Sequence, residues 1–272
     1  MSYEAFIGKQ ETKHDEISPR LVHGMAATLG MPTPEILPPL WHWMLFQDWV
    51  MPDQIGPDGH PRRGGFLPPV HHLPRRMWAG GRVRLLGDLH QGDAVSRTTT
   101  ILGVQEKQGG SGPLVFVTVR HVISGPRGAA IEEEQDIVYR GTEGAAVKPA
   151  APVTDRLQAG DGLTAEVLPD PVLLFRYSAL TGNGHRIHYD VDYVRDVEGY
   201  PGLIVHGPLQ ATWLAGLLSG QRIARFTFRG QRPAFHGNRL TLEARPGGPG
   251  FQLRTLDATG AVCMAAEAEL AG

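Results

Sequence analysis

Strand-forming segments follow one another through the first half of this chain, with only short glycine-bearing turns between them. They are rich in β-branched residues, as in PLVFVTVRHVIS, which begins at Pro113. Turns this short join antiparallel neighbours, whereas parallel strands need a long crossover connection. The chain must therefore build an antiparallel sheet, and its strands are expected near 83–86, 94–104, 114–124 and 131–139.

The same order of elements, a helix followed by strands, occurs twice. In the first half, Ser18 and Pro19 are a typical helix start, and we predict a helix over about 18–30. In the second half we predict a helix over about 207–220 and strands near 223–230, 239–245, 250–256 and 261–270. Residues 141–165 have the composition of a linker. The 272 residues therefore predict a duplicated α+β protein with domains at 1–150 and 151–272.

Composition excludes several classes of function. Lys and Arg total 26 against 28 Asp and Glu, so no overall basic field attracts nucleic acid. Cys263 is the only cysteine, which rules out an internal disulfide and a multi-cysteine zinc site. We see no leader-like segment and no run of about 18 apolar residues, so we expect a cytoplasmic protein without membrane contact. No phosphate-binding glycine loop or serine nucleophile elbow is present.

Two segments are rich in aromatic residues or histidines. Residues 40–50, LWHWMLFQDWV, predict a second buried helix, and residues 52–81, rich in proline and glycine, predict a long structured loop or arm. His71 and His72 in this arm suggest a metal, but no third ligand follows at helical spacing. We therefore expect no metal site.

Chemistry-bearing residues are densest between 175 and 210. Four short signatures follow one another there, namely Tyr177-Ser178, Gly182-Asn183, Ile187-His188 and Val205-His206-Gly207. Their order resembles the hydratase motif of the MaoC-like family. Asn183 stands where the usual family pattern has Asp, and a basic residue precedes Ile187-His188. In both respects the segment resembles one branch of the family, the fungal mitochondrial 3-hydroxyacyl-thioester dehydratases and the bacterial mesaconyl-CoA and itaconyl-CoA hydratases. The first half, in LPRRMWAGG and EEEQDIVYRG, looks like the degenerate first domain of those enzymes. The resemblance implies a double hot-dog fold, with each sheet wrapped around a central helix.

Hydration of an α,β-unsaturated thioester needs a base for water, a proton source for the α-carbon and stabilisation of the enolate oxygen. His188 matches the family's catalytic histidine and titrates near neutrality, so we expect it to be the acid/base. Asn183 is expected to orient water or substrate, because an amide cannot act as a base. The second acid/base is open: either His188 works alone, or Asp190, Asp192 or Glu198 contributes. Asp190 is also expected to cap a helix that begins beside it.

The amide of Gly207, at the start of an apolar helix, is the expected oxyanion donor, and the alternative is a turn that needs glycine only for backbone freedom. Arg186, with its neighbour His185, is a candidate for binding a substrate carboxylate. Arg225 and Arg229, on one face of a strand, are candidates for the phosphates of coenzyme A. For these arginines a solvated or structural role is the alternative.

The resemblance implies a hydratase of a short dicarboxylic enoyl-CoA, either itaconyl-CoA or mesaconyl-CoA linked through its 4-carboxyl, which gives citramalyl-CoA. The alternatives are a 3-hydroxyacyl-thioester dehydratase of fatty-acid synthesis and a non-catalytic acyl-CoA-binding module. A thioesterase is disfavoured, because residues 208–220 contain no carboxylate. We expect no cofactor beyond the coenzyme A of the substrate, and we expect a homo-oligomer.

Overall fold

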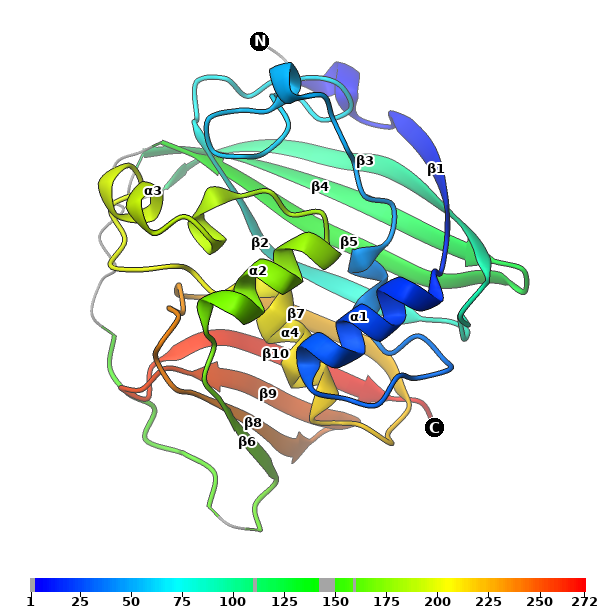
Figure 1. The fold of residues 1–272 in the computed structure, drawn as a ribbon, viewed down its shortest axis with the longest axis vertical. Coiled ribbons are helices and arrows are strands. Elements are labelled where there is room, and N and C mark those ends of the chain that lie inside the picture. The colour runs from blue at the N-terminus through cyan, green and yellow to red at the C-terminus, as the bar shows by residue number, and fades with distance from the viewer. Residues whose placement is uncertain (1–2, 110–111, 142–149, 159) are drawn as a thin grey trace.

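This computed structural model describes residues 3–109, 112–141, 150–158 and 160–272. Within these residues, ten strands form one curved antiparallel sheet (Figure 1). The strands of the first half are β1 (Gln10–Glu16), β2 (Arg75–Leu85), β3 (Ala94–Gly109), β4 (Gly112–Gly125) and β5 (Gly128–Arg140). Those of the second half are β6 (Leu163–Val167), β7 (Ile223–Gly230), β8 (Leu240–Gly247), β9 (Gly250–Leu256) and β10 (Val262–Leu270).

Both halves use one strand order. From the outer edge of the sheet to its middle, each half presents its first, third, fourth, fifth and second strand. The second strands, β2 and β7, pair antiparallel in the middle, with Gly81 opposite Phe228 and Val83 opposite Phe226. The duplicated order predicted from the sequence is thus found in the sheet. The predicted domain boundary at 150/151 lies between β5 and β6 and stays a prediction.

Helices lie on the inner, concave side of the sheet, where Figure 1 shows α1 (Pro19–Leu29), α2 (Pro171–Leu180) and α4 (Gly207–Gly216) together. A further helix, α3 (Val191–Asp196), follows α2 in the chain, and short 3-10 helices lie at Glu4–Phe6, Trp41–Met44, Pro52–Gln54 and Arg186–His188. Leu209 and Leu214 of α4 are fully buried against β7–β10. No helix in the described part of the chain is long and apolar enough to cross a membrane.

The helix predicted over 40–50 is wrong. Only Trp41–Met44 forms a single 3-10 turn. Pro38 and Pro39 precede this turn, and both Leu40 (φ 70°) and Phe46 (φ 58°) adopt a left-handed backbone, which a helix does not tolerate. The apolar pattern predicted burial correctly and the backbone conformation incorrectly.

Three strands or α-helices escape the sequence prediction, and a fourth begins earlier than expected. One of the three, β6, begins at Leu163, inside the segment 141–165 that we predicted as a linker, of which residues 142–149 and 159 lie outside the described part of the chain. β1 is polar, QETKHDE, because it is the edge strand beside β3 and exposes alternate side chains. α2 starts at Pro171 after Asp170, whose side chain accepts a hydrogen bond from the Leu173 amide. β2 begins at Arg75, inside the segment 52–81 that we predicted as an arm.

Residues 52–74 form the arm, which packs on the inner face of the first half. Val70 and Leu73 are fully buried there with Ile101, Val117 and Tyr139 of β3, β4 and β5. The guanidinium of Arg63 donates to the carbonyl oxygens of Val70, Leu73 and Pro74 and lies over the Tyr139 ring, 5.2 Å from its centroid. The arm is therefore a fixed part of the fold. It covers the inner face of β3, β4 and β5 and then continues into β2.

The junction of the two halves depends on a small residue at Gly80. A Cβ atom there would lie 2.4 Å from the Phe228 carbonyl oxygen of β7, so we expect Gly80→Ala to lower the free energy of unfolding by about 1–3 kcal/mol. Gly103→Ala in β3 is the control, because no atom lies within 4 Å of its Cβ position. Urea denaturation measures both variants, and equal losses would contradict the expectation.

Candidate functional site

The loop between α2 and α3, residues 181–190, carries most of the predicted site, and we call it the histidine loop. Its first turn is held by the Asn183 amide, which donates to the Ser178 carbonyl at 2.9 Å. Its far end is held by the Ile204 amide, which donates to the Ile187 carbonyl at 2.9 Å. Asp190 then caps α3 by accepting from the Tyr193 amide, which confirms the predicted cap.

His188 lies at the centre of this site and is only 6% exposed. Its Nδ1 is 2.7 Å from the Ile204 carbonyl oxygen, which can only accept, so Nδ1 carries the hydrogen. Nε2 of the neutral ring then has a free lone pair. Burial lowers the pKa of His188 to about 4, with the Ile204 hydrogen bond opposing this shift and the charge of His60 adding to it. His188 is therefore a neutral base at neutral pH.

His206, directly before α4, packs its ring against one face of the His188 ring. The two rings stack with centroids 3.6 Å apart and planes inclined by 17°. Nε2 of His206 is 2.8 Å from the Ser178 hydroxyl, and its Nδ1 is buried without a hydrogen-bond partner. Burial, followed by the charges of His188 and His185, holds the pKa of His206 well below its usual value of 6.5. The stack is thus two neutral imidazoles.

Gly207 begins α4 beside this stack, as predicted. Its φ is not left-handed, so the turn does not require glycine for backbone freedom. A Cβ atom there would meet only Met264 Cε, at 3.8 Å, so the protein does not crowd the position either. The glycine keeps a helix N-terminus open, where amides lack intrahelical acceptors and the helix dipole favours negative charge. This arrangement can stabilise an oxyanion.

Asn183 orders the histidine loop, since its Oδ1 accepts a hydrogen bond from the His185 amide at 3.0 Å.

The carboxylates that the sequence offered as possible second acid/base groups are engaged elsewhere or exposed. Asp190 caps α3, Glu198 pairs with Arg75 at 3.3 Å, and Asp192 faces solvent. The structure thus brings none of them to His188.

Arg186 lies beside the site with its guanidinium occupied. It binds Asp190 through Nε and Nη2, at 2.9 and 2.7 Å, and donates to the Pro57 carbonyl through Nη1. Its guanidinium also lies over the Tyr193 ring, 4.2 Å from the centroid. These contacts leave no free fork for a substrate carboxylate, so the predicted role of Arg186 finds no support in the geometry.

Arg225 and Arg229 lie on β7, away from the histidine loop. Both side chains are exposed on the face of β7 opposite to the buried Phe226 and Phe228. Arg225 pairs with Glu269 at 3.4 Å. Arg229 lines a cavity of about 480 Å³ on this outer face, and no residue of the histidine loop lines it. Their assignment to coenzyme A phosphates stays a prediction.

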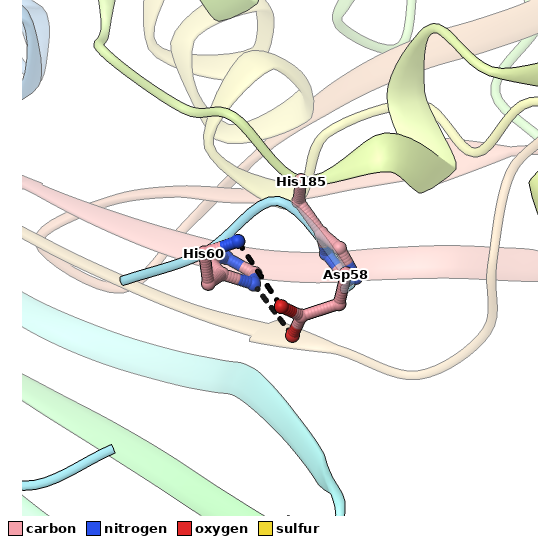
Figure 2. Close-up of side chains that lie close together, drawn as sticks. All are labelled: Asp58, His60 and His185. Atoms are coloured by element: carbon pink, nitrogen blue, oxygen red, sulfur yellow. Dashed lines mark hydrogen bonds and ion pairs between the residues drawn. The ribbon is translucent and has the colours of Figure 1, made fainter. Parts of the chain in front are cut away.

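Two residues beside the histidine loop, Asp58 and His60 of the arm, were not predicted from the sequence. Figure 2 shows their side chains together with His185 of the histidine loop. Asp58 Oδ2 is 3.2 Å from His60 Nδ1, and the rings of His60 and His185 lie with centroids 4.2 Å apart. His185 in turn meets the His188 ring edge to face, at 5.7 Å. A row of four imidazoles therefore runs from His60 through His185 and His188 to His206.

The surroundings of Asp58, His60 and His185 favour an anion over a cation. Their ligating atoms lie within 4.8 Å of one another, a spacing that a divalent metal can use. However, burial lowers the pKa of His60, the Asp58 hydrogen bond opposes this shift, and the charges of Arg76 and Arg63 add to it. Two positive charges that lower the pKa of His60 also disfavour a metal cation bound to it. We assign no metal to the cluster.

Known proteins resemble this chain along almost its whole length. Residues 40–236 match the family profile of hydroxyacyl-thioester dehydratase type 2. The mesaconyl-C(4)-CoA hydratase of Chloroflexus aurantiacus is 45% identical over 276 aligned positions, which cover 98% of each chain. A MaoC-like dehydratase of Phytophthora capsici superposes with a TM-score of 0.71 at 16% identity, covering 97% of this chain and 95% of that one. A Mycobacterium tuberculosis protein described as a double hotdog fold gives 0.55 at 14%, covering 97% and 96%. The predicted double hot-dog fold of the α+β class is confirmed.

Protonation of the buried histidines opposes folding. The pKa of His188 is about 4 in the folded protein, against 6.5 for the free side chain, so its contribution to stability is complete above pH 6.5 and is lost as pH falls toward 4. At about pH 5 the expected loss from this group is about 2 kcal/mol relative to about pH 7.5. Urea denaturation of His188→Asn should show a pH dependence smaller by that amount. An unchanged pH dependence would contradict the assignment, and His71→Asn, at an exposed arm position, is the control.

Proposed function

Because the chain belongs to the hydroxyacyl-thioester dehydratase type 2 family, we propose that it is a hydratase that adds water to a short dicarboxylic enoyl-CoA thioester. The observation that carries this proposal is the environment of His188. Its neutral ring, with Nε2 free, stacks on His206, the residue directly before the open N-terminus of α4. A proton acceptor next to an oxyanion-stabilising helix end is what hydration of a conjugated thioester requires.

The reaction follows from this geometry. The oxygen of a water molecule bonds to the β-carbon while Nε2 of His188 takes one of its protons. The electron pair of the double bond moves toward the thioester carbonyl, whose oxygen becomes an enolate and is stabilised by the Gly207 amide at the α4 N-terminus. A proton then returns to the α-carbon, which completes addition of H and OH across the double bond. The same groups catalyse the reverse dehydration.

The substrate we propose is mesaconyl-CoA linked through its 4-carboxyl, or itaconyl-CoA, with citramalyl-CoA as the product. The name of the Chloroflexus relative supports the first. Arg76 supports a second carboxylate on the substrate. It lies opposite Tyr139 on β5, whose side chain faces the core inside the sheet, and its charge lowers the pKa of both His60 and His185. Within the described residues Arg76 forms no ion pair, whereas its neighbour Arg75 pairs with Glu198. A cation without a carboxylate partner is well suited to bind one.

The remaining parts of the proposal rest on the sequence. We propose that the enzyme needs no cofactor beyond the coenzyme A of its substrate, acts in the cytoplasm as a homo-oligomer, and takes part in breakdown of itaconate-type acids. The enzymatic alternative is a 3-hydroxyacyl-thioester dehydratase of fatty-acid synthesis. The name of the matching family, hydroxyacyl-thioester dehydratase type 2, supports this alternative.

The function is tested by following the ultraviolet absorbance of the conjugated thioester, with mesaconyl-C(4)-CoA, itaconyl-CoA and crotonyl-CoA as substrates. We expect hydration of a dicarboxylic substrate, and we expect His188→Ala to lower kcat by about 10²–10⁴-fold, because the base is removed. His71→Ala is the control. A preference for crotonyl-CoA would support the fatty-acid alternative, and binding without turnover would support a non-catalytic module.

Selectivity for a dicarboxylic substrate tests the role of Arg76. We expect Arg76→Met to raise KM for the dicarboxylic thioester by about 10–100-fold, which corresponds to loss of a charged hydrogen bond, and to leave KM for crotonyl-CoA unchanged. Arg84→Met is a matched control on the same strand, because Arg84 is exposed and pairs with Glu132. If both substrates are affected equally, Arg76 does not read the carboxylate.

A further inference from the structure

The site proposed above lacks a second acid/base among the residues that the sequence offered. Hydration moves two protons, one away from water and one to the α-carbon, and the amide of Asn183 can carry neither. Asp190 and Glu198 are committed to Arg186 and Arg75, and Asp192 faces solvent. The carboxylate that does lie in the site is Asp58, which comes from the other half of the chain.

Backbone contacts hold the arm against the histidine loop. The Arg186 amide donates to the Asp58 carbonyl at 2.9 Å, and the Arg186 side chain donates to the Pro57 carbonyl at 3.1 Å. Gly59 has a left-handed φ of 89°, and a Cβ atom there would lie 1.9 Å from the Gly184 carbonyl oxygen. The two segments thus touch main chain to main chain. This contact leaves little freedom in where Asp58 and His60 are presented.

His60 differs from the other imidazoles of the row in its hydrogen-bond partner. Its Nδ1 lies 3.2 Å from a carboxylate oxygen of Asp58, whereas His188 meets a carbonyl and His206 a hydroxyl. Burial lowers the pKa of His60, and the Asp58 carboxylate opposes this shift by stabilising the imidazolium. The carboxylate also fixes the tautomer, so that Nε2 of the ring is free to exchange a proton. The His60 side chain is 20% exposed, whereas His188 and His206 are buried.

We propose that Asp58 and His60 form the second acid/base pair of the site, with His60 exchanging a proton with the substrate and Asp58 positioning His60. This inference rests on the hydratase function proposed above. His188 takes the proton that water loses as the C–O bond forms. The imidazolium of His60 gives its proton to the α-carbon of the enolate. His188 is then protonated and His60 neutral; between turnovers His188 loses its proton to solvent and His60 takes one up, which restores both groups.

The charged groups around His60 predict a pH profile with two limbs. On the arm it faces Asp58 and Arg63, on β2 it faces Arg76, and on the histidine loop it faces His185. Activity needs neutral His188 and protonated His60, so kcat/KM should fall on the acid side as His188 is protonated and on the alkaline side as His60 loses its proton. The alkaline limb therefore reports His60.

The test compares kcat/KM against pH for the full-length protein and three variants, His60→Gln, Asp58→Asn and His71→Gln, with mesaconyl-C(4)-CoA as substrate. We expect His60→Gln to lower the rate by about 10²–10⁴-fold and to abolish the alkaline limb. Asp58→Asn keeps the imidazole but removes its carboxylate, so the alkaline limb should move to lower pH by about 1 unit or more. His71→Gln, in the same arm and exposed, should match the wild type.

The outcomes separate this inference from the proposed function. If the wild-type protein does not hydrate the thioester, the proposed function is wrong. If the wild type is active and His60→Gln keeps both limbs, or if Asp58→Asn loses activity with an unmoved alkaline limb, the pair serves only structure and the inference is overturned. Near-ultraviolet circular dichroism checks that each variant is folded, and the limb shift in Asp58→Asn carries the test where His60→Gln fails to fold.

Discussion

The antiparallel pairing of β2 with β7 is the contact on which the rest of the structure depends. It joins two half-sheets with the same strand order into one sheet. Because the arm runs directly into β2, the pairing also places the arm next to the second half, where the arm contacts the histidine loop. Gly59 then meets Gly184 at a distance that excludes any side chain. A site made from both halves follows from this one junction.

Desolvation gives the site its chemical character. His188 and His206 are buried and stacked, and burial is the largest cause of the lowered pKa of each. Neutral imidazoles are bases, so the protein obtains a proton acceptor at neutral pH without a carboxylate on the histidine loop. The loss of the Asp that the family pattern has at the position of Asn183 is therefore compatible with catalysis. Burying the bases costs stability on the acid side, where they must be protonated.

Sequence reasoning located the histidine loop because its signatures are local. His188, the cap at Asp190 and the helix start at Gly207 all follow from short-range patterns, and the structure places each where it was expected. The helix predicted over 40–50 failed because apolar periodicity reports burial and not the left-handed backbone at Leu40 and Phe46. Arg186 was a reasonable carboxylate ligand from its position, yet Asp190, four residues later, occupies its guanidinium.

The sequence alone determined the duplicated antiparallel architecture, the family and the place of His188 in the histidine loop, because each depends on residues that are neighbours in the chain or repeat in order. It held one hint of the missing pair: Asp58 and His60 flank a glycine within a proline-rich arm too long to be a simple connection. Only the tertiary structure decided that Asp58 and His60 meet His185, that Arg76 forms no ion pair among the described residues, and that Arg225 and Arg229 face away. These relations join residues far apart in the chain, and their distances are set by the pairing of β2 with β7 and not by any local pattern.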